Sequence, residues 1–251
     1  MVGPTEVEAY DNPTGEPVYP GLPVGAYESV FDFGCGCGRL ARRLFQQEQR
    51  PGRYLGVDLH PAMIAWCQEN LTPATGFEFR HHDVAHPTRN PGPDKPRSRP
   101  LEGEDGGFTF VLAHSVFTHL VQADAEYYLS EAARLLAPEG ILLSTWFLFD
   151  KASFPMMQDF QNALYINEDD PTNAVIFDRD WLRVAARAAG LTISLAQPPD
   201  VRGFQWIVEM RPAGAGAAEA DIPSDEAPYA TPEDSLQAGT AEPDLSGSAP
   251  G

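Results

Sequence analysis

The feature that most constrains this chain is the stretch at 30–44, which reads VFDFGCGCGRLARRL. A short apolar run at 30–33 precedes three glycines at alternate positions, Gly34, Gly36 and Gly38, and a segment with helical apolar spacing follows. Strand, tight turn and helix in this order are the first unit of an open α/β sheet, whose ligands bind at the carboxyl ends of the strands. Because glycine has no Cβ, its backbone can pass close to a ligand. The sequence therefore predicts a ligand-binding loop after the first strand.

Two kinds of ligand suit such a loop. A dinucleotide loop has the pattern G-x-G-x-x-G/A and holds a pyrophosphate at the helix N-terminus. Here Arg39 stands where the third small residue belongs, and Asp32 lies two residues before the first glycine. A carboxylate at that place is unfavourable beside a pyrophosphate and favourable beside an ammonium group. The charges favour a ligand with an amino group, with a dinucleotide or a purely structural turn as the alternatives.

The pattern D-x-G-x-G-x-G, which begins at Asp32, resembles the first motif of class I S-adenosylmethionine-dependent methyltransferases. The resemblance implies that S-adenosylmethionine is the cofactor and that the Asp32 carboxylate serves the amino group of its methionine part, often through water. The residues that would hold this part of the cofactor with Asp32 are Phe33, Gly34, Cys35, Gly36 and Gly38.

A second acid follows the predicted strand at 53–58. Asp58 stands twenty residues after the last loop glycine, and an acid at the end of a second parallel strand can accept hydrogen bonds from both ribose hydroxyls of an adenosine. A nicotinamide dinucleotide would use the same acid, so Asp58 does not separate the two ligands. Leu59 is placed to pack on the adenine. The family resemblance implies that Asp83, after the third strand, holds the adenine amine and that the Val84 amide meets a ring nitrogen.

The second distinctive stretch is SVFTHL at 115–120, just beyond the predicted strand at 108–113. It looks like the corresponding segment of many small-molecule methyltransferases, which implies that His114 and Ser115 lie beside the methionine part and the methyl group. His114 and His119 are the candidate general bases, because histidine can take a proton near neutral pH. For His119, a packed or capping histidine is the alternative.

Strand-like and helix-like segments alternate through most of the chain. This pattern predicts a single α/β domain with a Rossmann-like, doubly wound, seven-stranded, mostly parallel sheet whose last strand is antiparallel. We expect the class I methyltransferase domain at 29–211, with an acceptor-covering insertion at 148–177 and a long unstructured loop at 86–107. Residues 1–28 are rich in Pro and Gly and are predicted to form an irregular lead. Residues 212–251 contain no Lys or Arg and are predicted to be a disordered acidic tail.

Charge and cysteine content narrow the function further. The net charge of -19 disfavours nucleic acid as a partner, because an acidic surface repels phosphate backbones. No apolar run has the length of a membrane span, so no membrane partner is expected. Cys35 and Cys37 stand one residue apart in the glycine loop, which argues against a disulfide framework and for a cytoplasmic location. His81, His82 and His86 are interpreted as solvated loop histidines, so no metal is predicted.

The sequence as a whole predicts a cytoplasmic S-adenosylmethionine-dependent methyltransferase. Its expected partner is a small-molecule acceptor, such as a sugar or a natural product, methylated on oxygen or nitrogen. A monomer or a homodimer is expected. Two alternatives stay open, a nicotinamide-dependent oxidoreductase and a non-catalytic binding protein with a methyltransferase-like fold. Asp32 and Arg39 argue against the first of these.

Overall fold

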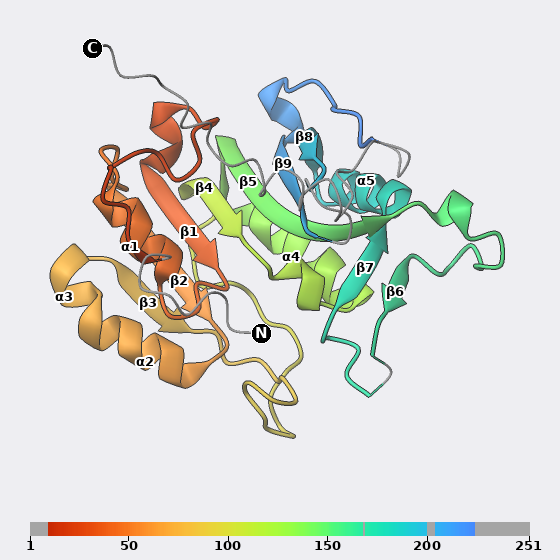
Figure 1. Cartoon of the computed structure of the whole chain (residues 1–251), viewed down its shortest axis with the longest axis horizontal. Coiled ribbons are helices and arrows are strands. Elements are labelled where there is room, and N and C mark those ends of the chain that lie inside the picture. Colours follow the sequence, from red (N-terminus) through yellow and green to blue (C-terminus); the bar gives the residue numbers. More distant parts are fainter. Residues whose placement is uncertain (1–9, 168, 200–203, 224–251) are drawn as a thin grey trace, which may run out of the picture.

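The computed structural model describes residues 10–167, 169–199 and 204–223. These residues form a nine-stranded sheet with helices on both faces (Figure 1). The strands are β1 (Ser29–Phe33), β2 (Arg53–Asp58), β3 (Glu78–His81), β4 (Phe108–Ala113), β5 (Leu136–Phe149), β6 (Ala163–Tyr165), β7 (Val175–Asp178), β8 (Leu191–Gln197) and β9 (Trp206–Pro212). The helices are α1 (Arg39–Gln46), α2 (Pro61–Asn70), α3 (Thr72–Thr75), α4 (Gln122–Leu135) and α5 (Arg179–Ala188), and short 3-10 turns lie between them.

The strand order explains where a site can form. The first five strands are parallel in the order β3-β2-β1-β4-β5, and β9 runs antiparallel between β5 and β8. This arrangement confirms the predicted doubly wound, mostly parallel sheet with an antiparallel last strand. From β1 the chain adds β2 and β3 on one side, and then returns to add β4 and β5 on the other side of β1. A switch of this kind between neighbouring parallel strands opens a crevice at their carboxyl ends.

The sheet has nine strands in the described residues, instead of the predicted seven. The two additional strands, β6 and β7, lie within the predicted insertion at 148–177 and form an antiparallel pair. They attach to the sheet because β5 is 14 residues long and its last residues, 147–149, pair in parallel with β7. The insertion is thus anchored to the same strand that carries the centre of the sheet.

Apolar side chains cover both faces of the central strands. In β1, Phe31 and Phe33 pack into the cluster that includes α4 and α5, while Val30 packs into the cluster that includes α1 and α2. A strand that is buried on both faces has its end fixed, and the loop that follows it is held in place. No helix in the described ranges is long and apolar enough to cross a bilayer.

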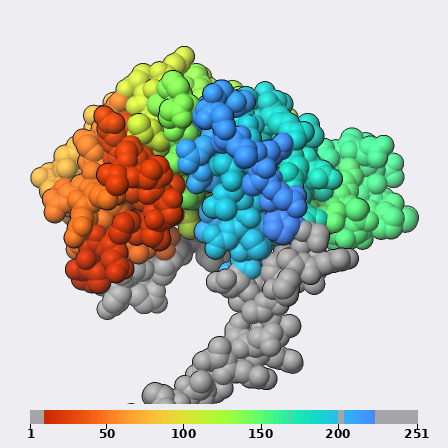
Figure 2. All heavy atoms as spheres, turned by 90° about the horizontal axis from the view of Figure 1, so that it is seen from above, coloured from red at the N-terminus to blue at the C-terminus, as the bar shows by residue number. Residues whose placement is uncertain are grey.

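The segment after β5 projects as a green lobe at one end of the molecule (Figures 1 and 2). Large apolar side chains on this segment are exposed, notably Met156 at 88% and Phe160 at 77%. Residues 10–28 at the other end of the sequence form turns and the 3-10 helix Val24–Tyr27. Residues 1–9 of the predicted lead lie outside the described residues.

The chain beyond β9 departs from the prediction of a disordered tail. The Ala220 amide donates to the Ile193 carbonyl at the edge of β8, and Ile222 is buried in the core cluster. Arg183 forms an ion pair with Asp221, 2.7 Å apart, and Arg187 pairs with Glu219. Residues 213–223 are therefore ordered against α5 and β8, because their acids meet the arginines of that helix. Residues 224–251 lie outside the described part of the chain.

Candidate active site

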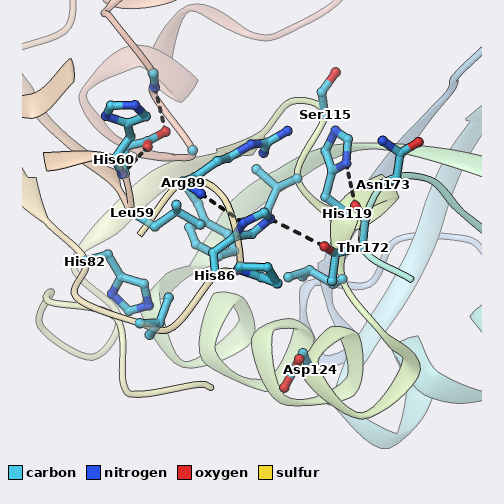
Figure 3. Close-up of a pocket in the computed structure, with 18 of the residues that line it drawn as sticks. Leu59, His60, His82, His86, Arg89, Ser115, His119, Asp124, Thr172 and Asn173 are labelled. Atoms are coloured by element: carbon cyan, nitrogen blue, oxygen red, sulfur yellow. Dashed lines mark hydrogen bonds between the residues drawn. The ribbon is translucent and has the colours of Figure 1, made fainter. Parts of the chain in front are cut away.

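A cavity of about 1140 Å³ opens at the carboxyl ends of the parallel strands. It is lined by the glycine loop after β1, by the end of β2, and by parts of three further segments, 82–97, 114–121 and 169–174. Figure 3 shows side chains from these segments facing the same space. Ligand pockets usually have volumes of roughly 300–1000 Å³. The cavity is therefore large enough for a cofactor and a small second molecule together.

The three loop glycines are required for two different reasons. Gly34, Gly36 and Gly38 all have positive φ angles, of 81°, 55° and 76°, which favour glycine. A Cβ on Gly34 would lie 2.4 Å from Val116, and one on Gly38 would lie 2.2 Å from Leu71, so packing excludes a side chain at both places. A Cβ on Gly36 would meet nothing within 4 Å. Gly36 instead keeps open the side of the loop that lines the cavity.

Asp58 ties the glycine loop to the end of β2. Its Oδ2 accepts a 2.9 Å hydrogen bond from the Gly36 amide, and its Oδ1 accepts a 2.8 Å bond from the His60 amide (Figure 3). The carboxylate is thereby fixed in orientation and lines the cavity with Leu59. Each carboxylate oxygen can accept a second bond, so Asp58 still has the capacity to hold two hydroxyls.

Asp32 lies beneath the loop and does not line the cavity. It is 1% exposed, and the Tyr54 hydroxyl donates a 2.5 Å hydrogen bond to its Oδ2. Burial raises the pKa of Asp32 to about 7, the Tyr54 hydrogen bond opposes that shift, and the charge of Asp58 adds to it. Asp32 would therefore act on a cofactor amine indirectly, through a water molecule or through its charge across the glycine loop.

Of the two residues predicted to hold the adenine, one lines the cavity and the other does not. Val84 lines the cavity. The Asp83 carboxylate is outside the lining, where it receives hydrogen bonds or ion pairs from Asn90 at 2.9 Å and Lys95 at 2.8 Å. The residue before it, His82, does face the cavity and is 3% exposed, with Nε2 2.9 Å from the Tyr128 hydroxyl. Burial lowers the pKa of His82 to about 4, so its ring is neutral at pH 7.

The turn after β4 is strained. Ser115 has a φ of +56°, the only positive value for a residue other than glycine in the described ranges. Its amide donates to Thr145 Oγ1 of β5 at 2.7 Å and its hydroxyl donates at 2.9 Å to Oε1 of Gln205, the residue before β9, so two other segments hold the turn in place. Strained backbone of this kind clusters at functional sites. His114 and Ser115 both line the cavity, and His114 Nδ1 is buried without a hydrogen-bond partner in the described residues.

His119 has a defined tautomer. Its Nδ1 lies 2.9 Å from the Thr172 carbonyl oxygen (Figure 3). A carbonyl only accepts, so Nδ1 of the neutral ring carries the hydrogen and Nε2 carries the free lone pair. Burial lowers the pKa of His119, against a smaller opposing contribution from the Thr172 bond. The ring is therefore available as a base at neutral pH.

Thr172 also contacts a histidine of the facing loop. His86 Nδ1 accepts from the Arg89 amide at 3.3 Å, so the opposite nitrogen, Nε2, carries the hydrogen in the neutral ring and faces Thr172 Oγ1 at 3.4 Å. The Thr172 hydroxyl in turn donates to Asp170 at 2.6 Å. These hydrogen bonds join the long loop at 86–107 to the segment at 148–177 (Figure 3). The loop predicted to be unstructured is thus part of the cavity wall.

Most of the predicted site residues are brought together, although their roles toward a ligand stay predictions. The predicted residues that line the cavity are Phe33, Gly34, Cys35, Gly36, Asp58, Leu59, Val84, His114, Ser115 and His119. Those that do not are Asp32, Gly38 and Asp83. The residues that the sequence did not single out for a site, and that the fold adds, include His60, His82, His86, Arg89, Tyr128, Thr172 and Gln205. In the described ranges, no group of three or more His, Cys, Asp or Glu side chains is arranged to hold a metal ion.

Several solved structures with a similar fold are described as methyltransferases. A putative methyltransferase in complex with the Trm112 methyltransferase activator, from Haloferax volcanii, is 17% identical, with 76% of this chain and 85% of that chain covered and a TM-score of 0.54. The 1,6-didemethyltoxoflavin-N1-methyltransferase of Burkholderia thailandensis, with its substrate and S-adenosylhomocysteine bound, is 22% identical, with 75% and 72% covered and a TM-score of 0.50.

The O-methyltransferase NcsB1 from neocarzinostatin biosynthesis, in complex with S-adenosylmethionine and 2-hydroxy-5-methyl naphthoic acid, is 17% identical, with a TM-score of 0.51. The match covers 76% of this chain and only 50% of the NcsB1 chain. Identities this low show a shared fold. Residues 31–142, from within β1 to the middle of β5, also match the family model described as "Methyltransferase domain". This match covers less than half of the chain; with the sheet order and the antiparallel β9, it makes the chain similar to class I S-adenosylmethionine-dependent methyltransferases over that range.

Proposed function

We propose that this protein transfers a methyl group from S-adenosylmethionine to a hydroxyl group of a small molecule. The observation that carries the proposal is one continuous cavity with two different ends. The glycine loop and Asp58 line one end, and His119, with its lone pair on Nε2, lines the other. The small-molecule acceptors named for NcsB1 and for the toxoflavin enzyme are consistent with a site of this size.

The first end fits the cofactor. Asp58 is oriented by two backbone amides and would accept from the ribose hydroxyls. The bare backbone of Gly36 leaves space for the methionine part, and the Arg39 guanidinium, which has no ion pair in the described residues, would meet its carboxylate. Asp32 would act on the amine from beneath the loop. Phe33, Leu59 and Val84 provide apolar contacts for the adenosine.

The second end provides a base. S-adenosylmethionine, when bound, supplies an electrophilic methyl carbon, so the protein has to orient the acceptor, exclude water and remove one proton. The His119 ring is neutral, and its Nε2 would take the proton of an acceptor hydroxyl while Nδ1–H stays bonded to the Thr172 carbonyl. That carbonyl also stabilises the imidazolium that results. His114, which also lines the cavity, is the second candidate base.

Calorimetric titration of S-adenosylhomocysteine into the folded protein tests the cofactor site. We expect saturable binding, and we expect Asp58→Asn to weaken it by about tenfold or more, since hydrogen bonds to a charged group are lost. Asp83→Asn is the matched control, because Asp83 lies outside the cavity lining. Absence of binding up to about 1 mM ligand, or binding of NADH in its place, would contradict the proposal.

We also propose a cellular location and an oligomeric state, each from fewer observations than the cofactor site. Cys35, Cys37 and Cys67 are all free thiols, which is consistent with the predicted cytoplasmic location. The Haloferax relative forms a complex with an activator protein, so a protein partner is a second possibility beside the predicted monomer or homodimer. Light scattering on the purified protein gives its oligomeric state directly.

A further inference from the structure

Two arginines in the cavity wall have no ion pair within the described part of the chain. They are Arg39, beside the glycine loop, and Arg89, on the long loop between β3 and β4. This is unusual in a chain with 36 acidic residues and only 17 Lys and Arg. Arg39 lies at the cofactor end. Arg89 lies at the other end, beside His86 and His119, whose pKa values its positive charge helps to lower.

The Arg89 side chain is free to contact a ligand. Its backbone amide donates to His86 Nδ1, while its guanidinium extends toward His119 and Ser115 (Figure 3). Two of the acids that line the cavity have other partners. Asp170 accepts from the Thr172 amide and hydroxyl, and Asp124 faces Arg97 at 3.9 Å. The Arg89 charge lowers the pKa of Asp170, but no acid in the described ranges forms an ion pair with Arg89.

We propose that Arg89 binds a carboxylate of the acceptor, and that the acceptor is therefore a hydroxy-carboxylic acid with a mostly apolar body. This inference rests on the proposed function. The planar guanidinium can hold a carboxylate through two parallel hydrogen bonds, which fixes both position and orientation. The hydroxyl of the same molecule then lies at His119 Nε2.

The rest of the cavity wall fits the apolar body of such a molecule. The cavity lining includes the apolar or aromatic side chains of Val116, Leu120, Tyr128, Phe147 and Pro171. Apolar walls with a few fixed polar groups are typical of sites for small organic molecules, with the polar groups setting orientation. A neutral sugar would leave Arg89 unpaired and would offer few apolar atoms to these walls.

The experiment is calorimetric titration of three isomeric hydroxybenzoates and of their carboxamides into the protein, with and without saturating S-adenosylhomocysteine. We expect at least one hydroxybenzoate to bind about 10- to 100-fold more tightly than its amide, the range for a charge-assisted contact. Arg89→Gln should abolish this preference without weakening the amide. Arg89→Lys should retain part of it, because a point charge remains but the paired geometry is lost.

Arg97→Gln is the matched control. Arg97 lies on the same loop and lines the same cavity, but its side chain is 72% exposed and faces Asp124. Arg97→Gln should keep the preference for the carboxylate. Thermal unfolding of each variant shows whether the fold of the loop is retained. We expect that it is, because the backbone amide of residue 89, not its side chain, donates the hydrogen bond to His86.

The outcomes separate the two proposals. The assignment of Arg89 is wrong if no hydroxybenzoate binds, or if acid and amide bind equally. It is also wrong if Arg97→Gln reduces the preference for the carboxylate as much as Arg89→Gln does. If S-adenosylhomocysteine fails to bind while a hydroxybenzoate still binds through Arg89, the proposed methyl transfer is wrong and the anion site stands.

Discussion

The Tyr54 hydroxyl donates a 2.5 Å hydrogen bond to Asp32 Oδ2, directly below the glycine loop. The two residues stand on adjacent parallel strands, β1 and β2, and both are buried. Burial raises the pKa of Asp32 to about 7, and the bond from Tyr54 keeps it from rising further. The pKa of this carboxyl group thus lies near physiological pH, so that both its charged and its neutral forms are populated there.

This balance predicts that cofactor binding depends on pH. An ammonium group favours the ionised form of Asp32, so the affinity for S-adenosylhomocysteine should rise between about pH 6 and about pH 8. Tyr54→Phe removes the bond that favours the carboxylate, and should shift the rise to higher pH. Asp32→Asn should bind weakly with a flat profile. Calorimetry at several pH values measures all three, and an unchanged profile in Asp32→Asn would show that another group titrates.

The same residue should make folding stability depend on pH with a defined sign. The pKa of Asp32 in the folded state, about 7, is above its ordinary value of 3.8, so the folded protein binds more protons between these values. Its contribution to stability is full below about pH 4 and is lost as the pH rises toward about 7. Asp32→Asn should remove this part of the slope. Urea unfolding of both proteins across that range provides the measurement, and a slope identical in both would contradict the prediction.

The two histidines that meet at Thr172 should be opposite tautomers. His119 is expected to carry hydrogen on Nδ1 and His86 on Nε2, because one bonds a carbonyl and the other accepts from a backbone amide. Long-range proton–nitrogen NMR distinguishes the two forms, with His119→Gln and His86→Gln used to assign the signals. Thr172→Val should leave the His119 tautomer in place, because the carbonyl is part of the backbone.

His119→Gln should also slow methyl transfer by about 100-fold or more if the ring is the general base. The loss should diminish as the pH is raised toward the pKa of the acceptor hydroxyl, since the base is then no longer required. Binding of S-adenosylhomocysteine should be unaffected. A loss of activity that is equal at every pH would point to a packing role for His119.

Gly36 and Gly38 form a matched pair for separating fold from function. Gly38→Ala would put a Cβ 2.2 Å from Leu71 in a left-handed conformation, and should destabilise the protein by about 2–5 kcal/mol. Gly36→Ala has space for its Cβ and should cost only about 1–2 kcal/mol of strain. The added methyl group faces the cavity, however, and should weaken S-adenosylhomocysteine binding at least about tenfold. Chemical unfolding and calorimetry measure the two effects separately.

The chain after β9 should contribute to stability through Ile222. This side chain is 5% exposed in the main core cluster, so Ile222→Ala should cost about 2–4 kcal/mol. Ile166→Ala is a suitable control, because that side chain is 65% exposed and should change stability by less than about 0.5 kcal/mol. Equal unfolding midpoints for both variants would mean that residues 213–223 do not hold the core.

The sequence predicts well what depends on local pattern. The glycine loop and Asp58 follow strands with short, clear apolar runs, and parallel strands place their ends at one edge whatever the connections are. Asp83 was less predictable, because the choice between facing the cavity and facing Lys95 depends on how the loop folds back. Ile222 stands in a sequence with the composition of a disordered tail, and only the arginines of α5 show what the segment meets.

Contacts between segments that are distant in the sequence cannot be predicted from the spacing of apolar residues. Thr172 reaches His86 and His119 because β7 pairs with the end of β5 and carries the preceding loop back over the site. Nothing periodic marks residues 163–178 as two strands, since each is only three or four residues long. Arg89 likewise lies in a loop with no helical or strand-like period, so its place beside His119 follows only from the fold.

The 14-residue strand β5 does more than complete the sheet. Its residues 136–144 pair with β4 and residues 142–146 with β9, while its last three residues pair with β7, which follows the segment that contacts His119. Side chains join these parts as well, because Trp146 of β5 packs against Phe117, which follows β4, and against Phe177 of β7. If the proposed function is correct, an exchange of residues 151–174 that keeps β5, β7 and these aromatic contacts should change the range of acceptors without changing the glycine loop after β1.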